Sequence, residues 1–271
     1  MEKPPVRMSL LFNKTLREDP TEAQAASHRL LLKAGLIYQI ASGIYSYLPL
    51  AHRALHKIET IVRREMDAIG GQELRMPALQ PRELWELTGR DISLGETLFS
   101  LSDRRQRHLI IAPTHEEVAT LLVRNHVQSY RNLPLILYQI QTKFRDEQRP
   151  RGGLVRVREF GMKDAYSFDA TQDGLDTNYR LMLKAYSNIF SSCGIPFLVV
   201  EADSGAIGGK DSHEFILPTP IGEDTVVWCN SCNYAANTER ASSQKTPAEP
   251  RPYREASQIS TPDISSIDNL A

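Results

Sequence analysis

Four arginines gather in one short segment whose composition suits it to hold an anion. Residues 148–158 include no acidic side chain, and Gly152-Gly153 turns the chain in the middle. The arginines are Arg149, Arg151, Arg156 and Arg158. A guanidinium group binds phosphate oxygens through a rigid fork of donors, and each such charge-assisted bond contributes about 1.5–3 kcal/mol. The segment predicts a phosphate-binding site, and a loop whose arginines only face water is the alternative.

The segments on either side of this loop alternate as β-strands do. Over residues 138–145, mostly apolar positions alternate with glutamine, lysine and arginine, so one face of this strand is expected to be apolar and the other polar. The second strand is expected to place on one face Arg156, Arg158, Phe160, Met162, Asp164, Tyr166 and Phe168. Cations, an aromatic ring and a carboxylate would then share one surface.

A second polar cluster occurs at residues 112–117. Thr114 and Glu117 have the spacing of a capping box, T-x-x-E, and the apolar run 118–123 follows them. This pattern predicts a helix start in which the Thr114 side chain caps the helix. That local role requires no function, and it is compatible with a Thr114 side chain that turns toward a ligand instead.

Two further patterns resemble known motifs and remain incomplete. Residues 205–210 are glycine-rich and end in Lys210, but Ser204 and Asp211 stand where a phosphate-binding P-loop needs glycine and a hydroxyl residue. This segment is interpreted as a tight turn. Cys229 and Cys232 form half of a zinc site, and no second pair with suitable spacing accompanies them, so the chain by itself is not expected to hold zinc.

The run TKFRDEQRPRGGLVRVREFGMKDAYSF, residues 142–168, resembles the second signature motif of class II aminoacyl-tRNA synthetases. As a whole it resembles bacterial-type prolyl-tRNA synthetases, and the resemblance covers residues from about Met8 to Arg240. It implies an α+β fold, a class II catalytic core whose antiparallel sheet is flanked by helices. It also implies that ATP activates L-proline and that the prolyl group passes to tRNA(Pro).

The resemblance implies a role for each matching residue of the nucleotide site. Arg145 would contact the α-phosphate and the substrate carboxylate, and Arg156 the γ-phosphate. Glu147 would accept from the adenine amine, and Phe160 would stack on adenine. Mg²⁺ would bridge the phosphates, with no tightly bound cofactor besides. Glu214 would serve Mg²⁺ or the substrate, and a solvated strand carboxylate is the alternative.

The amino-acid site follows from the same resemblance. Thr114 and Glu116 match a Thr-x-Glu loop that reads proline, and Met162 and Tyr166 would shape the small pocket, with Phe168 as a further candidate. A carboxylate such as Glu116 suits a buried secondary ammonium, because an unpaired charge there would be prohibitive.

The elements that must position these residues are visible in the periodicity. Apolar residues recur at helical spacing over residues 50–69, Gly70-Gly71 ends the helix, and a short strand over 72–76 closes at Pro77. Residues 50–77 resemble the first class II motif, which implies a homodimer. From periodicity alone this segment is a core helix.

Weaker signals predict the remaining elements. Helices are expected over residues 19–33, 81–88 and 177–192. A short helix and then a buried hairpin near residues 44–48 are expected after the first of them, and strands near 97–111, 195–201 and 212–216. The first helix has a capping carboxylate in Asp19 and a proline at its first turn.

Composition limits the class of protein. The chain has 271 residues, 41% hydrophobic and 24% charged, and a net charge of −1, so RNA contacts must come from local patches. It has no apolar run of membrane-spanning length, which predicts a protein with no membrane partner. Three widely spread cysteines favour a reducing compartment, and a cytoplasmic location is expected.

The resemblance also defines expected boundaries. Residues 1–240 are interpreted as an incomplete catalytic core that lacks the third class II motif. Residues 241–271, rich in Ser, Thr and Pro, are interpreted as a linker or disordered tail before an absent insertion domain. Such a chain is expected to be weak or inactive alone. The alternatives are a non-catalytic synthetase-like protein that binds ATP, an amino acid or a partner, and a threonyl enzyme, whose Cys/His/His zinc pocket has no counterpart in this sequence.

Overall fold

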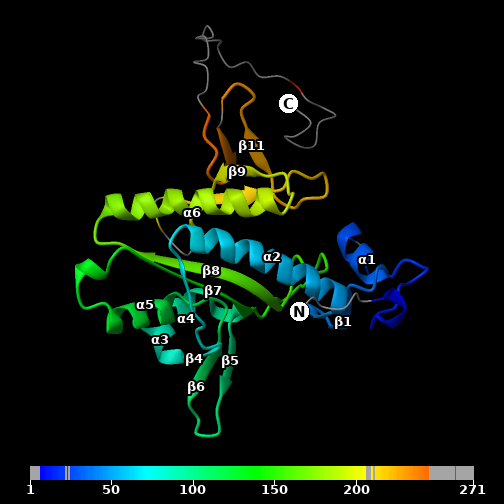
Figure 1. Cartoon of the computed structure of the whole chain (residues 1–271), viewed down its shortest axis with the longest axis horizontal. Helices are drawn as coiled ribbons and strands as arrows, with labels where there is room; N and C mark the ends of the chain where they lie inside the picture. Colours follow the sequence, from blue (N-terminus) through cyan, green and yellow to red (C-terminus); the bar gives the residue numbers. More distant parts are fainter. Residues whose placement is uncertain are drawn as a thin grey trace. The chain divides into compact units, whose positions relative to one another are not determined.

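Two ten-residue antiparallel strands form the centre of the first of two units, Met1–Phe197 and Leu198–Ala271, in the computed structural model (Figure 1). The described residues are 7–21, 23, 25–205, 209, 211–232, 234–243 and 260. Strand β7, Leu135–Phe144, pairs with β8, Glu159–Phe168, and β3, Gln72–Glu73, lies parallel to β7 on its other side. Both predicted strands are confirmed, but β8 begins at Glu159, so Arg156 and Arg158 precede the strand.

Two long helices cover one face of this sheet (Figure 1). They are α2, Pro49–Ala68, and α6, Gln172–Ser192. Met66, Ile136 and Tyr138 form the buried cluster between them and the strands. The predicted helix over 50–69 is confirmed. Helix α6 begins at Gln172 and not at residue 177, because the Thr171 side chain accepts the Gly174 amide and caps it there.

The opposite face of the sheet is covered only at one end. Helix α5, Glu116–His126, packs Val118 and Ala119 into a cluster with Met76, Tyr166 and Phe168. Phe168 therefore contributes to the core. The rest of this face, toward the loop between β7 and β8, carries the candidate site.

A small antiparallel sheet stands beside this face, in the order β4-β6-β5. Its strands are β4, Leu79–Pro81, β5, Phe99–Ser102, and β6, His108–Ile111, and its helices are α3, Arg82–Glu86, α4, Arg90–Ser93, and η2, Gly95–Thr97. Trp85 of α3 is fully buried and donates through Nε1 to Gln80 Oε1 at 2.8 Å. The predicted helix near 81–88 and the strand pair near 97–111 are confirmed. A further short helix, η3, Tyr130–Asn132, precedes β7.

The N-terminal elements differ from the prediction. They are η1, Met8–Leu10, α1, Ala26–Lys33, and a hairpin of β1, Ile37–Ala41, with β2, Ile44–Tyr47. Helix α1 begins after residue 25, because the Asp19 carboxylate binds Lys33 at 2.7 Å and does not cap a helix. Residues 22 and 24 of the predicted helix start lie outside the described part. The expected short helix is strand β1, and the hairpin exposes Tyr38 and Ile40, so it is not buried.

The second unit is a four-stranded sheet in the order β10-β9-β12-β11. Its strands are β9, Leu198–Glu201, β10, His213–Ile216, β11, Val226–Trp228, and β12, Ala235–Asn237. The predicted strands near 195–201 and 212–216 are confirmed. Most of the proposed turn at 205–210 and nearly all of the tail at 241–271 lie outside the described residues, so both stay predictions, as does a boundary after residue 240. None of the helices in the described ranges combines the length and apolar character needed to span a bilayer.

Gly153, between the two arginine pairs, is expected to be a steric requirement of the loop. Its φ is +67°, and a Cβ there would lie 2.7 Å from His28 Cβ. Gly89 has φ +69° and nothing within 4 Å of such a Cβ, so Gly89→Ala isolates the backbone cost of about 1–2 kcal/mol. Gly153→Ala adds a steric clash to this backbone cost. It should therefore lower the free energy of unfolding, measured by denaturant titration, by about 1–3 kcal/mol more than Gly89→Ala does, which is the usual cost of overpacking. Equal losses in both variants would contradict a close loop–α1 contact.

Lys163 is expected to make stability rise with pH. It lies on the helix-covered face of β8, donates to the Tyr186 hydroxyl and has its ammonium 4.0 Å from that ring's centre. Burial lowers the pKa of Lys163 to about 8. An unfolded lysine titrates near 10.4, so unfolding takes up a proton above pH 8 and the free energy of unfolding rises by up to about 1.4 kcal/mol per pH unit.

The measurement is denaturant unfolding at pH values from about 8 to 9.5, which lie within the window between the folded pKa of about 8 and the unfolded pKa of about 10.4. The difference between the native protein and Lys163→Met should grow over this window and stay constant below it. A difference that does not change with pH would show that Lys163 is charged in the folded state.

Candidate active site

The register of β7 and β8 puts the predicted nucleotide-binding residues on one face. Phe160 pairs with Lys143 and Met162 with Gln141, so these side chains project from the face that α2 and α6 leave free. Arg145 follows directly after β7, and its Cζ lies 5.3 Å from the centre of the Phe160 ring. The structure thus brings Arg145 and Phe160 together as a cation and an aromatic plate, the geometry of a cation–π contact.

The loop between the strands joins the other two nucleotide candidates. Arg156 Nε lies 3.5 Å from Glu147 Oε2, and Arg158 Nε donates to the Glu147 carbonyl at 3.0 Å. The Arg145 amide donates to the Arg158 carbonyl at 2.9 Å, which continues the strand pairing into the loop. Arg156 and Glu147 therefore bind each other. The side chain of Arg156 is about half exposed (48%).

The loop before α5 places the amino-acid candidates beside β8. The Thr114 hydroxyl donates to Glu116 Oε2 at 2.6 Å, and the His115 amide donates to the Tyr166 hydroxyl at 3.0 Å. The structure thus brings Thr114, Glu116 and Tyr166 together. The predicted capping box is wrong, because His115 occupies the cap position without a side-chain bond and the Thr114 hydroxyl is used on Glu116.

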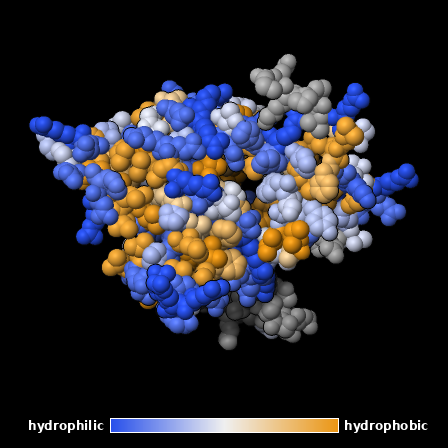
Figure 2. All heavy atoms as spheres, turned by 60° about the horizontal axis from the view of Figure 1, so that its bottom comes forward, coloured by the Kyte–Doolittle hydropathy of each residue, from blue (hydrophilic) through white to orange (hydrophobic). Residues whose placement is uncertain are grey.

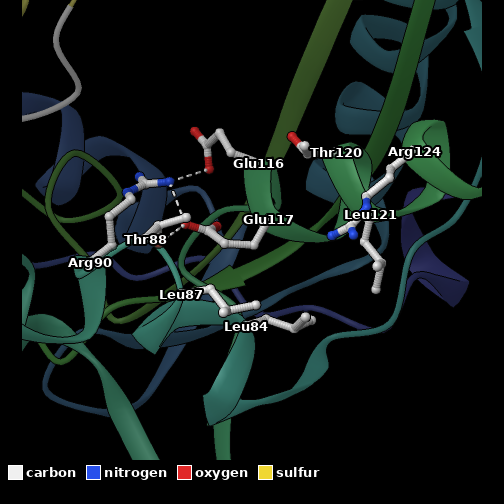
Figure 3. Close-up of a pocket in the computed structure, with 9 residues that line it drawn as sticks. All are labelled: Leu84, Leu87, Thr88, Arg90, Glu116, Glu117, Thr120, Leu121 and Arg124. Atoms are coloured by element: carbon white, nitrogen blue, oxygen red, sulfur yellow. Dashed lines mark hydrogen bonds and ion pairs between the residues drawn. The ribbon is translucent and has the colours of Figure 1, made fainter.

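Glu117 is a buried ion-pair partner and not part of a cap. Its side chain is only 2% exposed, and Oε1 accepts from Arg90 at 2.9 Å and from Thr88 at 3.2 Å. The same Arg90 Nη1 donates to Glu116 Oε2 at 3.1 Å. Figure 3 shows Arg90 between the two carboxylates, at the edge of a cavity of about 230 Å³. Burial opposes the charge on Arg90 and the two carboxylates outweigh it, so the pKa of Arg90 is raised.

Two residues of the polar face predicted for β7 are buried, whereas Gln141 is half-buried and Arg145, just after the strand, is exposed. Gln139 and Lys143 are fully buried, and both contact Asp164 of β8. His115 is fully buried beside Lys143. The strand therefore has buried residues on both faces, apolar under the helices and polar under the candidate site. This follows from the loop before α5, which closes over part of the polar face.

Arg90, His115 and Lys143 belong to this site, although the sequence did not single them out. Lys143 and Asp164 had a signal, because strand alternation placed both on the polar surface. Arg90 had almost none, since it follows Gly89 in a segment of mixed pattern. Arg90 is the first residue of α4. Its contact with Glu116 and Glu117 depends on the packing of the neighbouring helix α3 against α5.

Glu214 lies on β10 in the second unit, where its register partner is Val200. Its proposed role stays a prediction. Cys229 and Cys232 are exposed, and among the residues that the structure describes no group of three or more His, Cys, Asp or Glu side chains could hold a metal. The Ser231 amide, which donates to the Cys229 sulfur, and the neighbouring Cys232 lower the pKa of the Cys229 thiol.

Fold and site together define a class II synthetase core. Residues 99–254 match the family described as the tRNA synthetase class II core domain for G, H, P, S and T, and the chain belongs to this family. Within it, the similarity is to prolyl enzymes. The chain is 53% identical over 266 residues to a proline–tRNA ligase of Dehalococcoides mccartyi and 52% identical over 267 residues to that of Geobacillus kaustophilus. Each alignment covers 98% of this chain and 47% of the relative, so the chain spans about half the length of the curated relatives it matches.

Solved structures show the same fold. A prolyl-tRNA synthetase of Cryptosporidium parvum complexed with L-proline and AMP has a TM-score of 0.63 at 17% identity, covering 74% of this chain and 41% of that chain. The Giardia lamblia prolyl-tRNA synthetase in complex with prolyl-adenylate has a TM-score of 0.60 at 20% identity, covering 64% of this chain and 36% of that one. The predicted class II fold and the resemblance to prolyl enzymes are confirmed.

Removing Arg90 is expected to destabilise the site. Arg90→Met leaves the Glu117 carboxylate buried without its cation, which should lower the free energy of unfolding by about 3–5 kcal/mol. Adding Glu117→Gln should restore most of the loss, because the buried charge is then gone. Arg107→Met, which removes an exposed pair with Asp103 on the β5–β6 turn, is the control and should cost less than about 1 kcal/mol. Denaturant titration measures all of these variants, and equal losses for Arg90→Met and Arg107→Met would contradict the buried pair.

Proposed function

We propose that this protein activates L-proline with ATP to form prolyl-adenylate and passes the prolyl group to tRNA(Pro). One observation carries the proposal. Phe160, which contacts Arg145, and Tyr166 both project from the face of β8 that α2 and α6 leave free, and the loop that carries Thr114 and Glu116 is bound to Tyr166 through the His115 amide. A nucleotide triphosphate and an ammonium-bearing amino acid need those two kinds of surface side by side.

The nucleotide half of the proposal assigns four residues. Arg145 neutralises the α-phosphate and the proline carboxylate, and Arg156 binds the γ-phosphate. Glu147 accepts from the adenine amine and Phe160 stacks on the ring. Arg156 and Glu147 bind each other without a ligand, which keeps both side chains at the loop. ATP binding then exchanges this partly exposed pair for contacts with the two ends of the nucleotide.

The amino-acid half assigns Thr114 and Glu116 to the proline ammonium, and Met162 and Tyr166 to the wall of the pocket. Glu116 Oε2 already accepts from Thr114 and Arg90, so its carboxylate is held at one end and has a second oxygen for the ligand. A charged ammonium buried in this region requires such a partner.

The reaction needs placement and charge neutralisation more than a base. A proline carboxylate oxygen attacks the α-phosphorus of ATP, a new P–O bond forms, and the bond to the β-phosphate oxygen breaks so that pyrophosphate leaves with the electron pair. Arg145, placed at both reactants, stabilises the charge that accumulates on the α-phosphate oxygens. Orientation of two reactants in line is worth an effective molarity on the order of 10⁵–10⁸ M.

Mg²⁺ is proposed to accompany ATP. Magnesium in such sites is held mainly by substrate phosphates with one or two carboxylates, which agrees with the lack of a multi-ligand cluster among the described residues. Glu214 is the carboxylate proposed for this ion. When bound, Mg²⁺ neutralises phosphate charge.

A homodimer and a cytoplasmic location are also proposed. Helix α2 and strand β3, the segment predicted to form the interface, lie in the same unit as a hairpin that exposes Tyr38 and Ile40, and α2 exposes Ile58. Figure 2 shows apolar patches between hydrophilic side chains on the face turned forward. All three cysteines are free thiols, which agrees with a reducing compartment.

The test is proline-dependent exchange of pyrophosphate into ATP. Because the 271-residue chain is expected to be weak or inactive alone, exchange is measured with the chain alone and with the C-terminal part of a full-length relative added. Exchange should require L-proline and should not occur with L-threonine. Arg145→Ala should lower the rate at least about 10²-fold, the range for losing one preorganised charge-stabilising donor. Arg104→Ala, an exposed arginine in the turn between β5 and β6, is the matched control and should leave the rate unchanged.

Binding measurements separate the proposal from a non-catalytic protein. If ATP and L-proline bind by calorimetry while exchange is undetectable both with the chain alone and with the C-terminal part added, the chain is a non-catalytic binding module. If neither ligand binds, the proposed function fails.

A further inference from the structure

Lys143 is a fully buried cation to which the proposed reaction assigns no role. It lies on the site face of β7, two residues before Arg145, and its side chain has no exposed surface. Its ammonium is 2.7 Å from Asp164 Oδ1 and 2.8 Å from His115 Nδ1. A buried charge is tolerated only with such partners, so these two contacts determine where the ammonium can lie.

Asp164 connects this cation to both strands. Its other oxygen, Oδ2, accepts from the Tyr166 hydroxyl at 2.6 Å and from Gln139 Nε2 at 3.0 Å. The carboxylate is therefore held by three groups on β7 and β8. Tyr166, one of the residues proposed to line the proline pocket, takes its orientation from this bond.

His115 carries the network into the loop before α5. Its Nδ1 accepts from Lys143, and its Nε2 donates to the Pro77 carbonyl at 3.1 Å. Both ring nitrogens are used, one as acceptor and one as donor, which defines a neutral imidazole with its proton on Nε2. Burial and the Lys143 charge lower the pKa of His115, in agreement with that state. Its backbone amide donates to Tyr166.

The anchored His115 lies between the two residues proposed to recognise the ammonium, Thr114 and Glu116. The backbone of the same loop is tied to the end of β7, because the Phe144 amide donates to the Ala112 carbonyl at 3.0 Å. The position of Glu116 relative to Arg145 thus depends on contacts made by the His115 side chain, and not on contacts made by Thr114 or Glu116.

We propose that Lys143 and Asp164 are the positioning pair of the amino-acid site, holding His115 and so keeping Thr114 and Glu116 in register with Arg145. The ligand-dependent part of this inference rests on the proposed function. The pair touches neither substrate. Its loss is expected to weaken proline binding while ATP binding, which uses the loop between β7 and β8, persists.

The test uses the double variant Lys143→Met/Asp164→Asn. A single Lys143→Met would leave a buried carboxylate unpaired and unfold the site, whereas the double variant removes both charges and leaves an amide oxygen for Tyr166 and Gln139. Lys163→Met is the matched control. It removes a partly buried lysine that directly precedes Asp164 on β8 and whose side chain faces α6.

Calorimetric titrations with L-proline and with ATP give the first readout. The double variant should bind proline about tenfold to a hundredfold more weakly, the range for losing one charge-assisted hydrogen bond, with ATP affinity changed less than about twofold. Lys163→Met should change neither affinity. Equal weakening of both ligands in the double variant, or unchanged proline affinity, would overturn the proposal.

A second readout needs no ligand. Nitrogen NMR of the His115 ring should show one tautomer in the native chain and a mixture in the double variant, and the His115 amide should exchange with solvent faster in the variant. If the native chain binds neither proline nor ATP, the proposed function fails, and these signals still decide whether the pair holds the loop. A folded double variant that keeps the tautomer and the slow exchange would refute the positioning role.

Discussion

The antiparallel register of β7 with β8 is the constraint on which the rest of the structure depends. Ten consecutive pairs, from Leu135 with Phe168 to Phe144 with Glu159, decide which side chains share a face. A shift by one residue would send Asp164 and Tyr166 under the helices and bring Lys163 to the site. The apolar contacts of α2 and α6 with Ile136 and Tyr138 oppose such a shift, so the packing of one face specifies the chemistry of the other.

The site face combines charges in two different environments. The arginines and Glu147 of the loop between the strands lie at the surface, where solvent screens them and ligands can displace their mutual contacts. Lys143 and Asp164 lie below, where the pair is desolvated and its geometry is rigid. The surface charges can rearrange to bind ligands, and the buried pair holds the site residues in fixed positions. A site that must hold two reactants in line requires both properties.

The segment around Thr114 shows why local patterns can be misinterpreted. Its T-x-x-E spacing predicted a cap, and a cap is worth about 1 kcal/mol to a helix. In the folded chain the Thr114 hydroxyl binds Glu116, and Glu117 is drawn into a buried pair with Arg90. The Asp19 carboxylate likewise binds Lys33 and leaves the start of α1 uncapped. In each case another side chain competes for the capping group: the near neighbour Glu116 for Thr114, and the more distant Arg90 and Lys33 for Glu117 and Asp19. Cap patterns describe none of these competitors.

The sequence by itself determined the two central strands, helix α2, the arginine-bearing loop and the residues that resemble a class II synthetase, because alternation, helical spacing and consecutive motifs are local properties of the chain. Only the tertiary structure decided that Arg90 lies between Glu116 and Glu117, that Arg156 binds Glu147, and that Lys143 is buried beneath the site. Those arrangements depend on which distant elements meet and on which charges lose their water when they do. The desolvation of Lys143 and Asp164 is a property of the assembled fold, because it requires the loop before α5 to cover β7. The local sequence therefore does not predict it.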